Sequence, residues 1–194
     1  MRWGRVEVHP GFLLMIAWLN YLETQGMVPV ALLACACHEL GHYAALKVLG
    51  NDIQLLRLNA VGAEMLPQKP MGYGQEILTV AAGPAASLLL AVMFCHWEWG
   101  GLFAGLNLVL GCFNLLPVSR LDGGRVLKCL LSLAAGPHIS ALICAYLDLC
   151  ITLALLLLGL ILVLTARNLT LLTVSLWLVL SYFNGKERKK GLPD

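Results

Sequence analysis

The sequence predicts an all-α polytopic membrane protein with six transmembrane helices and a small β element at the membrane interface. Its 194 residues are 59% hydrophobic and only 12% charged, and the mean hydropathy is +0.80. That charged share is about half the share of an ordinary soluble domain, too small to cover a soluble surface. Apolar stretches also recur along the whole chain. These observations exclude a disordered chain and an ordinary cytosolic domain, and we expect no nucleic-acid partner.

A helix needs about 20 mainly apolar residues to cross the hydrocarbon of a bilayer. Six segments are candidates: residues 11–22, 27–49, 75–95, 100–118, 149–166 and 169–183. The fifth could begin nearer Ser140, and Arg167 and Asn168 separate it from the sixth. We expect one domain over residues 1–194, with its core motifs between residues 38 and 124. Helices five and six then occupy about 140–184, and 185–194 form a polar tail.

Two segments have strand character. Residues 5–9 read RVEVH, a strict alternation, and residues 51–70 contain β-type stretches around Gly62. We expect them to form a small sheet in the interface, because a strand edge exposed to lipid would leave backbone groups unpaired. Segment 51–70 either pairs with an unwound substrate strand by β-augmentation or only covers the interface.

The distribution of basic residues predicts the topology. With the N-terminus in the cytoplasm and six spans, 12 of the 13 Lys and Arg residues face the cytoplasm, and Arg167 alone lies outside. Cytoplasmic loops carry such an excess of positive charge. Both termini are therefore expected in the cytoplasm of a multi-pass protein.

The second predicted helix contains an HExxH motif, His38-Glu39-Leu40-Gly41-His42. Residues four apart share a helix face, so the two imidazoles can bind one zinc ion. Glu39 lies close enough to act as a general base on the attacking water. Chance would give about 0.005 such motifs in this composition, and ionisable groups inside a membrane span are usually functional. The alternatives are a polar seam between helices and the cation path of a transporter.

Asp122 is the best candidate for the third protein ligand that a catalytic zinc requires. Pro117 should end or kink the fourth helix, which would display Asp122 at the cytoplasmic end of that helix. On the predicted topology, His38 and His42 lie on the same side of the membrane as Asp122. The alternative is that Asp122 caps the next helix or pairs with a nearby arginine.

Asn114 is a candidate catalytic residue two turns before Asp122. A buried amide must find partners, and this one either binds the substrate backbone or the oxyanion, or makes an interhelical hydrogen bond. For Asn107 we expect the interhelical bond. The sequence identifies no other substrate-binding residue.

The HExxH motif and the N-x-x-P-x₄-D-G-G pattern roughly 80 residues later resemble the site-2 protease family of intramembrane zinc metalloproteases, peptidase M50. Within it, residues 8–10, 38–42, 82–86 and 114–126 are similar to the stage IV sporulation protein FB branch. That branch continues into a cystathionine-β-synthase-type domain, which we do not expect in this chain. Its absence would remove nucleotide-dependent control.

The resemblance implies a zinc ion held by His38, His42 and Asp122, with Glu39 as the catalytic acid. It implies an endopeptidase in the cell membrane whose active site lies towards the cytoplasm. The substrate would be a transmembrane or membrane-associated segment, such as a sigma-factor precursor or an anti-sigma factor, and an inhibitory membrane partner is compatible with this scheme. Because every candidate residue falls between His38 and Asp122, we expect the last two helices to be dispensable for zinc binding.

Overall fold

The computed structural model describes residues 2–3, 5–10, 13, 17, 21, 26–59, 62–97, 100–166, 171–176 and 179. The chain forms two compact units, Met1–Leu116 and Pro117–Asp194. The first predicted helix, 11–22, lies almost entirely outside the described residues.

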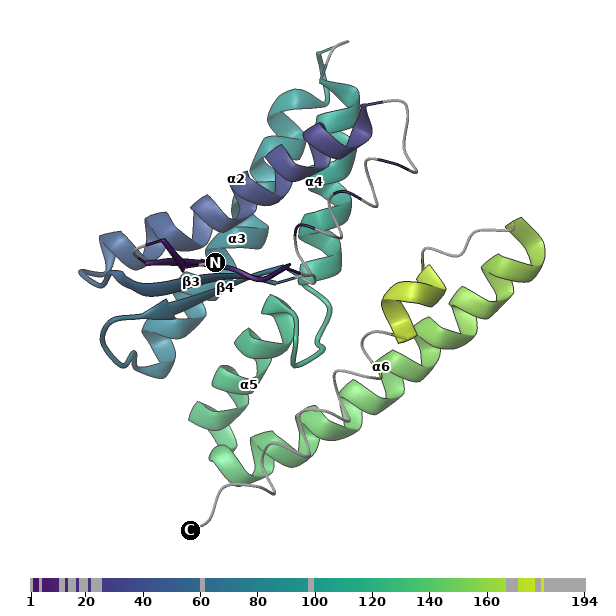
Figure 1. The fold of residues 1–194 in the computed structure, drawn as a ribbon. Helices are drawn as coiled ribbons and strands as arrows, with labels where there is room; N and C mark the ends of the chain where they lie inside the picture. The colour runs from purple at the N-terminus through teal and green to yellow at the C-terminus, as the bar shows by residue number, and fades with distance from the viewer. Residues whose placement is uncertain are drawn as a thin grey trace. The chain divides into compact units, whose positions relative to one another are not determined.

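The first unit contains three helices that pack side by side, α2 (Met27–Val48), α3 (Tyr73–Phe94) and α4 (Gly101–Asn114) (Figure 1). They correspond to the second, third and fourth predicted segments. Helix α4 ends at Asn114 and not at Val118, because Pro117 cannot donate a helical hydrogen bond. Its 14 residues rise about 21 Å, less than the hydrocarbon thickness of about 30 Å.

The same unit contains a four-stranded sheet in the order β1 (Arg2–Trp3), β2 (Val6–Val8), β3 (Ile53–Asn59) and β4 (Gly62–Pro67). Strands β2 and β3 are parallel, whereas β1–β2 and β3–β4 are antiparallel. The predicted pairing of segments 5–9 and 51–70 is therefore confirmed. The two-residue strand β1 was not predicted, because it is too short to show a pattern. Glu7 lies opposite Arg57 in the register, and the two side chains form an ion pair of 3.1 Å.

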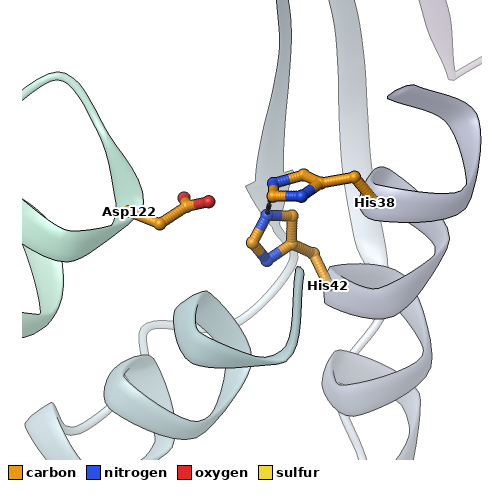
Figure 2. Close-up of side chains that lie close together, drawn as sticks. All are labelled: His38, His42 and Asp122. Atoms are coloured by element: carbon orange, nitrogen blue, oxygen red, sulfur yellow. Dashed lines mark hydrogen bonds between the residues drawn. The ribbon is translucent and has the colours of Figure 1, made fainter. Parts of the chain in front are cut away.

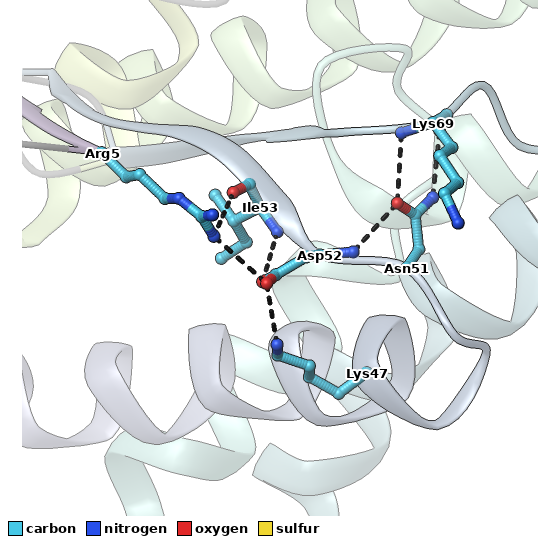
Figure 3. A network of polar contacts seen from close by, with 6 residues as sticks. All are labelled: Arg5, Lys47, Asn51, Asp52, Ile53 and Lys69. Atoms are coloured by element: carbon cyan, nitrogen blue, oxygen red, sulfur yellow. Dashed lines mark hydrogen bonds and ion pairs between the residues drawn. The ribbon is translucent and has the colours of Figure 1, made fainter.

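A polar network at Asp52 joins the end of α2 to the sheet (Figure 3). The Asp52 Oδ2 atom lies 2.9 Å from Lys47 Nζ and 3.1 Å from Arg5 Nη1. Its Oδ1 atom accepts the backbone N–H of Ile53 at 2.8 Å. The hydrogen bonds from Lys47 and from Ile53 favour the charged carboxylate and lower the Asp52 pKa to about 2.

Asn51 closes the base of the β3–β4 hairpin beside this network. Its Nδ2 donates to the Lys69 carbonyl at 3.0 Å, and its Oδ1 accepts the Lys69 N–H at 3.1 Å (Figure 3). Hydrogen bonds thus join the two ends of the hairpin to each other, and an ion pair joins the hairpin to the helix that carries the HExxH motif.

The second unit contains α5 (Asp122–Ala135) and α6 (Pro137–Ala166). Helix α5 is not among the predicted segments, because it mixes charged and apolar residues and is too short to span a membrane, and α6 begins before the predicted start at residue 149 or 140. The end of α5 coincides with a glycine followed by a proline, which is a sequence signal for a helix boundary. Gly136 has a φ of 85°, in the left-handed region, and Pro137 is the first residue of α6.

Two contacts organise this unit. The Ser140 hydroxyl, fully buried, donates to the Lys128 carbonyl at 2.8 Å and joins the start of α6 to α5. Gly159 lies so close to the Leu172 backbone that an added Cβ would approach it to 2.9 Å. Residues 171–176 are helical, and the rest of the sixth predicted helix lies outside the described residues.

Within the described residues, two helices are long and apolar enough to cross a membrane. They are α3, with mean hydropathy 2.1, and residues Pro137–Thr165 of α6, with mean hydropathy 2.8. Only 17% of the α6 window is buried inside the protein, so its leucine-rich surface is exposed. The mainly helical fold with a small sheet is confirmed, and the count of six spans stays a prediction.

Candidate metal centre

Two imidazoles from one face of α2 meet in the first unit. His38 Nε2 and His42 Nε2 lie 3.2 Å apart, and the rings are nearly perpendicular at 82° (Figure 2). His38 is 4% exposed, and His42 is half-buried. The prediction that the i, i+4 spacing brings both rings together is confirmed.

Helix α3 orients both rings from the opposite side. His42 Nδ1 lies 2.9 Å from the Thr79 carbonyl oxygen, and His38 Nδ1 lies 3.0 Å from Ser87 Oγ. A carbonyl can only accept, so His42 donates from Nδ1, and in the neutral ring its Nε2 then carries the lone pair. Ser87 is completely buried and can accept the Nδ1 proton of His38 in the same way. Such partners are typical of histidines that bind a metal through Nε2.

Two glycines allow this close packing of α2 on α3. A Cβ on Gly41 would approach the Ala82 carbonyl oxygen to 2.7 Å, and a Cβ on Gly83 would overlap the His42 imidazole. Gly83 therefore leaves the volume that the His42 ring occupies. Gly83 thus helps to place a candidate ligand in addition to allowing the helices to pack closely.

The two histidines fit a zinc ion. Two nitrogens bound at about 2.05 Å to a tetrahedral zinc are about 3.3 Å apart, close to the separation seen here. Both Nε2 atoms face each other, and both Nδ1 atoms are held by α3. The donor set therefore matches the metal that the HExxH motif predicts.

Asp122, also drawn in Figure 2, belongs to the second unit and is the first residue of α5. It was expected at the end of the fourth helix, and instead it opens a helix of its own. It is half-buried and follows a tight turn in which the Leu121 N–H donates to the Val118 carbonyl at 2.8 Å. Gly124 packs against the backbone of that turn, and a Cβ there would overlap the Val118 carbonyl.

The other predicted site residues lie in the first unit. Glu39 is half-buried on α2, beside His38. Asn114 is half-buried at the end of α4, and its Nδ2 donates to the Leu110 carbonyl of its own helix at 3.0 Å. This bond is neither of the two that the sequence suggested, so the catalytic role of Asn114 stays a prediction.

Ser87 and Thr79, which contact the two rings, are not among the site residues predicted from the sequence, and the contacts of Asn107 also differ from those expected. Asn107 is fully buried, and its Nδ2 donates to the Phe103 carbonyl of its own helix at 2.9 Å, whereas a bond to another helix was expected. Its Oδ1 has no hydrogen-bond partner among the described residues. A backbone carbonyl such as that of Thr79 has no sequence signal, whereas a serine in the apolar run of α3 could have been noted.

Comparisons with known proteins find metalloproteases among the proteins similar to this chain. A family model described as Peptidase family M50 matches residues 96–159. The chain is 28% identical to a zinc metalloprotease of Methanocaldococcus jannaschii over 95% of this chain and 58% of that protein. It is 33% identical to stage IV sporulation protein FB of Bacillus subtilis over 66% of this chain and 48% of that protein. The chain thus spans about half the length of these curated relatives.

A solved structure has a similar fold. The site-2 protease from Methanocaldococcus jannaschii matches with a TM-score of 0.70 and 27% identity, over 97% of this chain and 92% of that one. The fold is therefore similar to that of a site-2 protease. The chain thus contains a match to peptidase family M50, and it resembles zinc metalloproteases and a site-2 protease over most of its length.

Proposed function

We propose that this protein is a zinc-dependent intramembrane endopeptidase of the site-2 protease type. The observation that carries the proposal is the pair of Nε2 atoms 3.2 Å apart on α2, with both Nδ1 atoms bonded to α3. The cation path of a transporter would not require hydrogen bonds that fix the tautomers of both histidines. The match to family M50 and the names of the metalloprotease relatives support the same conclusion.

The proposed zinc ligands are His38, His42 and Asp122, with a fourth position left for water. Bound zinc would acidify that water and polarise the scissile carbonyl. An aspartate completes the donor set because two neutral imidazoles alone leave the dication's charge uncompensated. The domain proposed for this chemistry is the whole of residues 1–194.

Glu39 is proposed as the general base and acid. Its carboxylate would take a proton from the attacking water and return it to the leaving amine. Its place on α2, next to one ligand and half-buried, suits this shuttle. Asn114 has a second N–H beyond the one that Leu110 accepts, and we assign that donor to the substrate backbone or to the oxyanion.

The substrate is proposed to be a transmembrane or membrane-associated segment of another protein. A helical segment must unwind near the cut, because its carbonyls are otherwise bonded internally. Strand β4 is an end strand of the sheet, so it offers an edge for the unwound chain. The likeness to stage IV sporulation protein FB makes a sigma-factor precursor or an anti-sigma factor the first candidates, with an inhibitory membrane protein as a regulatory partner.

The test is co-expression with candidate transmembrane substrates, comparing wild type with Glu39→Gln. Removing the base should slow cleavage by about 10²–10⁴-fold, whereas zinc content should remain. Glu7→Gln is the matched control, because Glu7 is half-buried on β2, which is paired on both sides and offers no edge to the substrate. Cleavage at the wild-type rate by the Glu39→Gln protein would refute the mechanism.

A further inference from the structure

The second unit contains a buried carboxylate that the proposed chemistry does not use. Asp148 lies within α6, among apolar residues, and is 8% exposed. Its Oδ1 accepts the backbone N–H of Ser119 at 2.6 Å. A carboxylate in such a place is costly unless its hydrogen bonds are made. The short contact supplies such a hydrogen bond to the Asp148 carboxyl group.

The partner of Asp148 lies in the turn that leads into Asp122. That turn is held on its apolar side by Val118 and Leu121, which are both buried. Gly124 closes on the peptide group between Val118 and Ser119, with no room for a Cβ. Asp148 binds the N–H of that same peptide group. One peptide is thus fixed by a helix that is distant in sequence and by the first turn of α5.

We infer that Asp148 is a positioning residue that fixes the backbone carrying Asp122 and thereby holds the third zinc ligand in place. The inference rests on the proposed function, because it takes Asp122 as a ligand. It reverses the expectation that the last helices are dispensable for zinc binding. Helix α6, which spans residues 137–166, would contribute to metal affinity through one hydrogen bond to the loop.

The chemistry of the contact predicts a graded series. Asp148→Asn keeps one acceptor oxygen and replaces the other with an NH₂ group, whereas Asp148→Ala removes the acceptor and leaves the Ser119 N–H without its Asp148 partner. Loss of a group that orients a metal ligand typically costs 10- to 100-fold in affinity, so we expect ~10-fold weaker zinc binding for the alanine variant and a smaller loss for the asparagine variant. The readout is the zinc dissociation constant of the full-length protein in detergent, from competition with a chelator.

The matched control is Thr152→Val. Thr152 lies one turn after Asp148 on the same helix and is 7% exposed, so it tests the loss of a buried polar group without the loop contact. Its zinc affinity should equal that of the wild type. A similar loss in Thr152→Val and Asp148→Ala would mean that any polar change in α6 perturbs the protein, and would overturn the inference.

A double-mutant cycle separates this inference from the proposed function. If Asp148 acts through Asp122, then Asp148→Ala should weaken zinc binding little further in an Asp122→Ala background. Additive losses would overturn the inference and leave the ligand assignment intact. Unchanged affinity in Asp122→Ala itself would instead refute Asp122 as a ligand. If the Asp148→Ala protein does not fold, the same double-mutant cycle can be measured with Asp148→Asn.

Discussion

The imidazoles of His38 and His42 are the two candidate zinc ligands on α2. With both Nδ1 atoms engaged by α3, the two Nε2 atoms are left to face one another. We expect about one zinc ion per chain in protein purified in detergent. His38→Ala should lose most of it, because a single helix then offers one imidazole. Metal analysis of the purified variants measures the ratio, and full zinc content in His38→Ala would show that the metal binds elsewhere.

Ser87 permits a finer test of the same site. Its buried hydroxyl is the partner of His38 Nδ1, so Ser87→Ala should free that ring to rotate and should weaken zinc binding by ~10-fold. Chelator competition gives the affinity. The control is Ser132→Ala, because Ser132 is also buried but bonds only the Lys128 carbonyl of its own helix. Equal affinities in all three proteins would contradict an orienting role for Ser87.

Between elements, the contact of α2 with α3 depends on glycine. A methyl group at position 83 would occupy the volume of the His42 ring, so Gly83→Ala should displace His42 and reduce zinc binding and cleavage together. Overpacking of this kind also costs about 1–3 kcal/mol of stability. Gly74→Ala, in the same helix with open space around it, should leave both properties unchanged. Zinc content and thermal unfolding in detergent measure the two effects.

The junction of α2 with the sheet depends on the charge of Asp52. Since its folded-state pKa is lowered to about 2, its contribution to stability is present above about pH 4 and is lost as the pH falls towards 2. The Tm difference between wild type and Asp52→Asn should therefore be greatest near neutral pH and shrink on acidification. A difference that stays constant down to pH 2 would contradict the proposed stabilisation by the Lys47 and Arg5 contacts.

Much of the fold and of the site follows from patterns in the sequence, and the exceptions have physical reasons. Four-residue spacing was enough to bring His38 to His42, and alternation was enough to pair 5–9 with 51–70. Helix α5 was missed because its mixture of charged and apolar residues resembles a loop when only membrane spans are sought. The partners of the rings could not be foreseen, since the Thr79 contact uses a backbone atom and the Ser87 contact depends on helix packing.

For the whole molecule, the bias of 12 basic residues against one predicts both termini in the cytoplasm. Reporter fusions after Glu98 and after Arg167 should report the outside, and a fusion after Lys69 should report the inside. A C-terminal fusion found outside would remove one span from the scheme. It would also break the match in depth between the histidines and Asp122 on which the proposed ligand set depends.

The packing of α2 on α3 has a consequence for synthesis of the chain. His38 and its partner Ser87 are 49 positions apart, and Thr79, the partner of His42, lies within that stretch. Asp122 follows 35 residues later, which a ribosome adds in about 2–7 s. A nascent chain therefore has both imidazoles in place before the aspartate exists. If Asp122 is the third ligand, as proposed, tight binding of zinc must wait until the second unit has been made.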